Sequence, residues 1–200
     1  MTLPIPTNLS QLTTYLRQGK RRLTIEVWRL WLQRKNDARP TNPPTLASLP
    51  PEPTVLFLCF GNICRSPMAE RFLRNRLTEI GREGGTVRSA GFVEQDGRSS
   101  PDPAVTVARE YDVNLAEHGA KRVTREMVED SDVVFVMDMW NYYDMKDAFA
   151  DAMDRVYFLK PADENGGGFE IRDPHHSGVK RFETVYGTIA DAIDRLVESR

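Results

Sequence analysis

The feature that most constrains the fold of this chain is a short apolar run that leads into a glycine-containing turn. Val55–Leu58 are all apolar, the turn around Gly61 follows, and apolar side chains from Met68 to Ile80 then recur at helical spacing. This order predicts a buried strand, a loop and a helix. Such a unit is the repeating element of a parallel sheet.

The following residues continue this alternation of strands and helices. Further strands are expected at 86–90, 132–137 and 155–159. Helices are expected at 101–111, 124–129 and 141–150, and a closing helix carries Phe182, Val185, Ile189, Ile193 and Leu196 on one face. The pattern predicts an α/β fold, a three-layer α/β/α arrangement with a four-stranded parallel sheet, plus an N-terminal helical extension. A site is expected at the carboxyl ends of the strands.

The N-terminal quarter has a different composition. Residues 1–39 are predicted to form a basic amphipathic helical extension, because apolar residues within 9–34 recur at helical spacing; Gly19 is expected to weaken or break this helix midway. Residues 40–53 contain six prolines, which favours an extended, semi-rigid linker. The main domain is therefore expected to span residues 54–200.

Charge is unevenly distributed between these parts. The chain has a net charge of -2, yet its first 53 residues contain eight basic and only three acidic residues. The main domain is thus acidic, and no nucleic-acid partner is expected. The basic arm, which contains Trp28 and Trp31, is expected to contact its own domain, a dimer mate, a partner protein or an anionic membrane surface, and an organelle-targeting peptide is a further alternative. No apolar stretch reaches 18 residues and no secretory pattern begins the chain, so a cytoplasmic location is expected.

The chemistry is concentrated in the sequence CFGNICRSP at residues 59–67, between the first predicted strand and helix. Backbone N–H groups at such a junction can converge on one anion. A thiol near a helix N-terminus and an arginine is stabilised as the thiolate, which makes Cys59 the expected nucleophile. The planar guanidinium of Arg65 matches two phosphate oxygens, so Arg65 is the expected phosphate clamp.

The other residues of this loop are expected to shape the anion site. Gly61 allows the backbone to approach a phosphate, and Asn62 tolerates a left-handed turn. Ser66 can donate to the sulfur of Cys59. The predicted phosphate-binding residues are Phe60, Gly61, Asn62, Ile63, Cys64, Arg65 and Ser66. This chemistry requires no metal and no cofactor.

The run VLFLCFGNICRSPMAE at residues 55–70 resembles the signature of low-molecular-weight protein tyrosine phosphatases. The resemblance continues through most of residues 54–199, and supporting pieces are SAG at 89–91, PDP at 101–103 and DVVFVMDMWN at 132–141. It implies a cysteine-dependent enzyme that hydrolyses phosphotyrosine in protein substrates through a phosphocysteine intermediate. It also implies that Asp173, in the late Asp173-Pro174 pair, is the general acid and base, and that Cys64 is a redox partner that forms a reversible disulfide with Cys59.

The sequence departs from that family beside the expected site. Family members that act on phosphotyrosine commonly place an aromatic residue after the Asp-Pro pair, where this chain has His175 and His176. Phe92 is the only aromatic residue in the loop after residues 89–91. These three residues are the predicted substrate wall. They do not determine which leaving group the substrate carries. Ile63 favours phosphotyrosine, because relatives that act on phosphoarginine tend to have threonine at that position.

Other functions remain as alternatives. A phosphatase for another substrate such as phosphoarginine, or a non-catalytic phosphate-binding scaffold, fits the same loop. Thioredoxin-coupled arsenate reductases use additional cysteines, whereas this chain has two, so that activity is not expected. A metal site at His175 and His176, with His118 and Asp173, has too thin a ligand set, and none is predicted.

Overall fold

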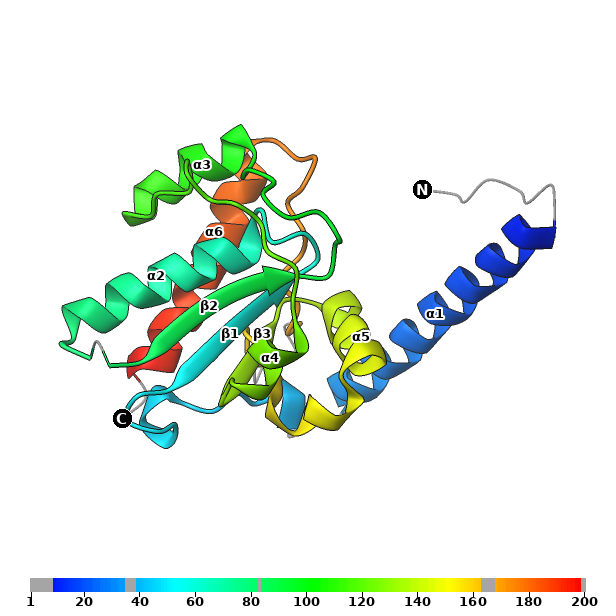
Figure 1. Ribbon diagram of the computed structural model, residues 1–200, viewed down its shortest axis with the longest axis horizontal. Coiled ribbons are helices and arrows are strands. Elements are labelled where there is room, and N and C mark those ends of the chain that lie inside the picture. Colours follow the sequence, from blue (N-terminus) through cyan, green and yellow to red (C-terminus); the bar gives the residue numbers. More distant parts are fainter. Residues whose placement is uncertain (1–8, 35–38, 83, 163–167, 199–200) are drawn as a thin grey trace.

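The computed structural model describes residues 9–34, 39–82, 84–162 and 168–198 (Figure 1). Its centre is a four-stranded parallel sheet in the order β2-β1-β3-β4. The strands are β1 (Thr54–Cys59), β2 (Thr86–Gly91), β3 (Val133–Val136) and β4 (Val156–Phe158). The predicted α/β class and parallel sheet are confirmed.

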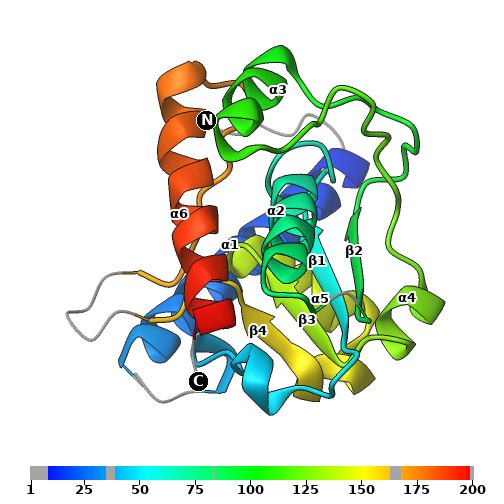
Figure 2. The same ribbon diagram turned by 90° about the vertical axis from the view of Figure 1, so that its left-hand side faces the viewer.

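Helices cover both faces of this sheet (Figures 1 and 2). The helices are α1 (Leu9–Arg34), α2 (Arg65–Glu79), α3 (Asp102–Ala108), α4 (Arg125–Glu129), α5 (Met139–Ala148) and α6 (Val179–Glu198). One apolar core joins alternate strand residues such as Phe57 and Phe135 to α2, α3 and α6. A second core joins the intervening residues, such as Leu56 and Val134, to α1, α4 and α5. The strands are therefore buried on both sides, which explains their continuous apolar runs.

Several helix boundaries differ from the sequence prediction; α2, for example, begins at Arg65 rather than at Met68. The expected helix at 101–111 ends as α3 at Ala108 and continues as a 3-10 turn at Arg109–Tyr111. Helix α5 begins at Met139 rather than at 141, because the carboxylate of Asp138 caps it by accepting from the backbone N–H of Asn141 at 2.9 Å.

The predicted break of the first helix at Gly19 is wrong. Helix α1 runs without interruption from Leu9 to Arg34. A single glycine in a helix costs only about 1 kcal/mol relative to alanine, which the neighbouring turns can offset. The half of α1 that follows Gly19 docks on α5, and Ile25 and Leu32 are buried there. The first half projects away from the sheet (Figure 1).

The proline-rich segment before β1 is packed on the domain, in contrast to the extended tether expected for it. It forms short 3-10 turns at Arg39–Thr41 and Leu46–Ser48, and Leu46 is part of the first core. Arg82 donates to the backbone carbonyls of Leu46 and Pro50 at 3.1 and 2.9 Å. These contacts hold the segment against the end of α2.

In the described part of the chain, no helix has the length and apolar character needed to cross a membrane.

Candidate active site

The loop at residues 59–65 lies at the carboxyl end of the sheet, between β1 and α2. Cys59 is the last residue of β1, Cys64 is the N-cap of α2, and Arg65 begins the helix. Asn62 has a φ of 50°, which gives the chain the left-handed turn that folds the loop back on itself. The turn brings the backbone N–H of Asn62 to the sulfur of Cys59, in front of the N-terminus of α2, where an anion is favoured.

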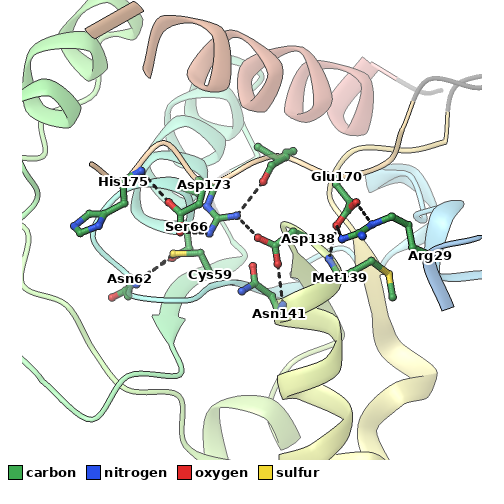
Figure 3. A network of polar contacts seen from close by, with 12 residues as sticks. Arg29, Cys59, Asn62, Ser66, Asp138, Met139, Asn141, Glu170, Asp173 and His175 are labelled. Atoms are coloured by element: carbon green, nitrogen blue, oxygen red, sulfur yellow. Dashed lines mark hydrogen bonds and ion pairs between the residues drawn. The ribbon is translucent and has the colours of Figure 1, made fainter. Parts of the chain in front are cut away.

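The sulfur of Cys59 accepts two hydrogen bonds inside this loop. The backbone N–H of Asn62 donates at 3.2 Å and the hydroxyl of Ser66 at 3.1 Å (Figure 3). Both bonds direct the positive end of a dipole at the sulfur. Ser66 thus makes the contact that the sequence predicted for it.

The side chain of Asn62 locks the loop in place and is fully buried. Its Nδ2 donates to the hydroxyls of Ser66 and Ser89, each at 2.9 Å, and its Oδ1 accepts from the backbone N–H of Lys121 at 2.8 Å. The Nε2 of His118 donates to the carbonyl of Asn62 at 2.7 Å. Burial lowers the pKa of His118, which keeps this imidazole neutral. The Nδ2, Oδ1 and carbonyl oxygen of Asn62 each have a hydrogen-bond partner. These bonds hold the left-handed turn in place.

Arg65 is almost completely buried, and its guanidinium spans two carboxylates. Nη1 donates to Asp138 Oδ2 at 2.5 Å and to the carbonyl of Ile171 at 2.9 Å, while Nη2 donates to Asp173 Oδ2 at 2.8 Å. Burial lowers the pKa of Arg65, but the charges of Asp138, Cys59 and Asp173 together raise the pKa by more than burial lowers it. The group therefore stays cationic. Its Nε has no acceptor among the described residues, which leaves one buried donor for an anion.

Asp173 lies on the described segment between β4 and α6 and is partly open to solvent, with its side chain 43% exposed. Its Oδ2 accepts from Arg65, and its Oδ1 accepts from the backbone N–H of His175 at 3.1 Å. The carboxylate can therefore reach both the buried guanidinium and an incoming molecule. The structure joins Arg65 and Asp173 in an ion pair, and the charge of Cys59 acts on the same guanidinium.

Comparison with known proteins identifies the family to which this chain belongs. Residues 54–199 match the family described as low molecular weight phosphotyrosine protein phosphatase. The chain belongs to this family. A probable low molecular weight protein-tyrosine-phosphatase AmsI of Erwinia amylovora is 33% identical over 154 residues, which cover 73% of this chain and 96% of AmsI.

Solved structures of the phosphatase family agree with this assignment. The crystal structure of the Erwinia amylovora tyrosine phosphatase AmsI aligns with a TM-score of 0.65 at 32% identity, covering 74% of this chain and 95% of that one. The YwlE arginine phosphatase from Geobacillus stearothermophilus aligns with a TM-score of 0.64 at 28% identity, covering 72% and 90%. The family match begins at residue 54, so α1 and the packed proline-rich segment lie outside it.

The predicted substrate wall of this phosphatase-family chain is only partly assembled around the loop. Phe92 is half-buried and packs against the second core, although its backbone N–H donates to the carbonyl of Phe60 at 2.9 Å. His175 and His176 are exposed, and their rings lie 3.8 Å apart. Burial and the neighbouring His176 lower the pKa of His175. The side chain of Phe60 is 53% exposed directly beside Cys59, which makes it a further aromatic surface at the entrance.

Cys64 is a free, buried thiol beneath the loop. Burial raises its pKa, with a further contribution from the charge of Cys59. Its carbonyl accepts from the hydroxyl of Tyr186 on α6 at 3.1 Å. Cys64 is therefore a protonated thiol at neutral pH.

Sequence reasoning missed Asp138, Asn141 and Glu170. Asp138 both caps α5 and holds Arg65. In the amide orientation that satisfies both of its neighbours, Asn141 accepts from the backbone N–H of Phe60 at 3.2 Å. The one available signal was the aspartate that directly follows the apolar strand, because parallel strands place such residues at the same edge of the sheet as Cys59.

Within the described ranges, no cluster of three or more histidine, cysteine, aspartate or glutamate side chains is placed to hold a metal ion.

Proposed function

We propose that this chain hydrolyses aryl phosphate esters, with phosphotyrosine in proteins as its substrate, through a phosphocysteine intermediate on Cys59. The observation that carries the proposal is the network in which Cys59 faces two loop donors while Arg65 joins Asp173 to the same site. A nucleophile, a cation for the phosphoryl oxygens and a proton donor are the groups that phosphoryl transfer to a side chain needs.

The first chemical step transfers the phosphoryl group to sulfur. The thiolate of Cys59 attacks phosphorus, and the bond to the phenolic oxygen breaks. Backbone N–H groups of the loop and the guanidinium of Arg65 stabilise the charge on the phosphoryl oxygens. Asp173 protonates the leaving phenolate, whose conjugate acid has a pKa of about 10.

The second step returns the enzyme to its starting state. Asp173, now a carboxylate, takes a proton from a water molecule that attacks the phosphocysteine. The sulfur leaves as a thiolate, and the hydroxyl of Ser66 stabilises it by donating the hydrogen bond seen at 3.1 Å. Phosphate then departs.

Binding of a phosphate requires a change of partners at Arg65. The guanidinium is held by Asp138 and Asp173, and only its Nε lacks an acceptor in the described part of the chain. An incoming phosphate gives Nε an acceptor and competes with Asp173 for Nη2. Asp173 is thereby released toward the leaving group, whereas Asp138 keeps Arg65 in position.

Phosphoarginine is the second candidate substrate, because an arginine phosphatase is among the structural relatives. Ile63 favours the aryl ester, since its branched apolar side chain can contact a phenyl ring. The two candidates have different leaving groups, an oxygen and a nitrogen, so they can be separated directly. A reducing compartment such as the cytoplasm suits the enzyme, because the nucleophile must remain a free thiol.

The test is hydrolysis of p-nitrophenyl phosphate, phosphotyrosine peptides and phosphoarginine with EDTA present. We expect the wild type to hydrolyse the aryl esters, Cys59→Ser to be inactive and Asp173→Asn to lose about 10²-fold or more in kcat. Activity that survives Cys59→Ser rejects the assigned nucleophile. A preference for phosphoarginine replaces the proposed substrate, and a folded but inactive wild type supports the phosphate-binding scaffold.

A further inference from the structure

Helix α1 lies outside the family match, yet its inner face is built into this domain. Trp28 packs against Tyr142 and Tyr143 of α5, with ring centroids 6.4 and 5.9 Å apart, and the ammonium of Lys146 lies 4.2 Å from the Trp28 ring. Arg21 forms an ion pair with Asp144. These contacts fix α1 on α5, the helix whose first turn stands beside Arg65.

A bidentate ion pair continues this interface toward the active site. Arg29 on α1 donates from Nε to Glu170 Oε2 at 2.6 Å and from Nη2 to Oε1 at 3.2 Å. Both side chains are only about one-fifth exposed, since Arg29 is 22% and Glu170 21% exposed. A bidentate, mostly desolvated pair fixes the orientation of a carboxylate better than a single surface contact does.

Glu170 in turn holds the backbone N–H of Met139, next to one acceptor of Arg65, and directly precedes the other acceptor in the chain. Its Oε1 accepts from the backbone N–H of Met139 at 2.9 Å, and Met139 directly follows Asp138 (Figure 3). The next residue, Ile171, supplies the carbonyl that accepts from Arg65. One acceptor of Arg65 Nη1, Asp138, is therefore next to the Met139 N–H that Glu170 holds, and the other, Ile171, is next to Glu170 itself.

From these contacts we propose that Arg29 is a positioning residue of the active site, acting through Glu170 on Asp138, Arg65 and Asp173. The proposal rests on the proposed phosphatase function and adds α1 to its machinery. Without Arg29, Glu170 loses both guanidinium donors, keeps only the backbone N–H of Met139 among the contacts described here, and can turn toward solvent. The segment from Glu170 to Asp173 and the first turn of α5 then move apart, and the guanidinium and the general acid lose their shared orientation.

The expected signature is a loss that depends on the leaving group. Asp173 is needed most when the leaving group is basic, so a misplaced acid affects phenyl phosphate more than p-nitrophenyl phosphate. We expect Arg29→Met in the full chain to lower kcat for phenyl phosphate about tenfold, with a smaller loss for p-nitrophenyl phosphate and little change in KM. Arg29→Lys should recover part of the loss.

Matched variants separate positioning from general stability. Arg22 is an exposed basic residue on the same helix, so Arg22→Gln should leave both rates unchanged. Glu170→Gln and the double variant with Arg29→Met should resemble Arg29→Met alone, because the two residues act as a unit. Melting temperatures identify any variant that is merely less folded.

Two results overturn the inference. One is an Arg29→Met enzyme with wild-type rates on both substrates. The other is a loss of kcat that is equal for both substrates and parallels the fall in melting temperature across the variants. A wild type that hydrolyses neither ester overturns the proposed function instead, and thus the two failures are distinguishable.

The outer face of α1 has an exposed leucine repeat, which is independent of the contacts of Arg29. Leu9, Leu16, Leu23 and Leu30 recur at a strict seven-residue interval. Leu16, Leu23, Val27 and Leu30 are between 53% and 68% exposed. A seven-residue leucine repeat on one face of a helix is the pattern of helices that pair along an apolar seam. Its exposure here leaves that seam uncovered by the described residues of the domain.

We further propose that this seam pairs with the same seam of a second copy of the chain, in antiparallel orientation. An antiparallel pair centred on Leu23 brings Leu16 opposite Leu30 and Lys20 opposite Glu26 of the other copy. A parallel pair in register brings Lys20 opposite its own equivalent, which is repulsive. Charge complementarity therefore selects the antiparallel pair, and the two-fold symmetry makes each contact occur twice.

Sedimentation of the full chain over a wide concentration range tests this pairing. The wild type should dimerise, and the triple change Leu16→Gln, Leu23→Gln and Leu30→Gln should abolish the dimer, whereas Arg22→Gln should not. Lys20→Glu should weaken it, and adding Glu26→Lys should restore it. A wild type that stays monomeric throughout overturns the proposal, and a monomer that binds anionic vesicles through the same leucines assigns the seam to a membrane instead.

Discussion

Gly91 lies at the end of β2, directly against the loop that holds Cys59. A Cβ at this position would meet the backbone N of Asn62 at 2.8 Å and the carbonyl oxygen of Phe60 at 2.9 Å. Neither atom belongs to a flexible side chain, so the loop itself would have to move. We expect Gly91→Ala to lower kcat by about 10²-fold through displacement of the loop donors. Steady-state kinetics, with inorganic phosphate as a competitive inhibitor, measure the effect.

Gly119 offers the matched control for this substitution. A Cβ there meets only Gly97 Cα at 3.6 Å, an ordinary van der Waals contact. Gly119→Ala should therefore keep wild-type kinetics and phosphate inhibition. Equal kinetics for both alanine variants would show that the loop adapts to the added carbon.

Cys64 gives a prediction about oxidation. Peroxide converts the thiolate of Cys59 to a sulfenic acid, and the Cys64 thiol can then attack that sulfur, forming the disulfide and releasing water. Because burial raises the pKa of Cys64, Cys64 itself is protected from direct oxidation. We expect wild-type activity to return after thiol reductant is added, and Cys64→Ala to recover much less. Equal recovery of the two enzymes contradicts this role.

The residues that face the sulfur could be predicted because their spacing is local. Cys59, Asn62, Arg65 and Ser66 fall within one strand–loop–helix junction, where the direction of each group follows from the turn. Glu170 could not be predicted, because it meets Arg29 across 141 positions. No local pattern distinguishes such a carboxylate from a solvated one.

The contact between α1 and α5 contains a carboxyl group with an unusual pKa. Burial raises the pKa of Asp144 to about 6, although its ion pair with Arg21 lowers it, and the nearby Asp138 and Asp147 add to the increase. In the unfolded chain the same group titrates near 3.8. The folded state therefore binds the proton more tightly between these two values. Stability from this group is fully present below pH 3.8 and is lost as the pH rises to about 6.

Asp144→Asn removes this titration while keeping the shape of the side chain. We expect the free energy of unfolding of the wild type, relative to the variant, to fall by on the order of 2 kcal/mol between pH 4 and pH 6, and to stay level above that. Urea unfolding of both proteins at a series of pH values measures the difference. A difference that rises with pH would mean that the ion pair with Arg21 outweighs burial.

The elements themselves followed from sequence more readily than their packing did. Alternating apolar runs gave the order of strands and helices. The prolines before β1 favour a tether when read locally, but Arg82, thirty or more positions later, binds the carbonyls of Pro50 and Leu46 and holds the segment on the domain. Gly19 similarly favours a break when read locally, whereas α1 is continuous.

At the scale of the whole molecule, helix α1 of the N-terminal extension is part of the second core, together with the sheet, α4 and α5. Its inner face adds Ile25 and Leu32 to the apolar residues of α5 and the sheet. The sequence predicted a basic amphipathic helix here, and contact with its own domain was one of several alternatives. The deciding contacts join α1 to residues more than a hundred positions away, so only the structure places it.

Truncation tests what this extension contributes to the whole. Deleting residues 1–34 removes Ile25 and Leu32, and burial of one such side chain is worth about 1.5–3 kcal/mol. We therefore expect the free energy of unfolding to fall by about 3 kcal/mol or more, and kcat to fall as in the Arg29 variant. Deleting residues 1–18 keeps every inner contact from Arg21 onward, so it should preserve both quantities. If the longer deletion also preserves them, α1 is an attachment that neither stabilises the domain nor orders its active site.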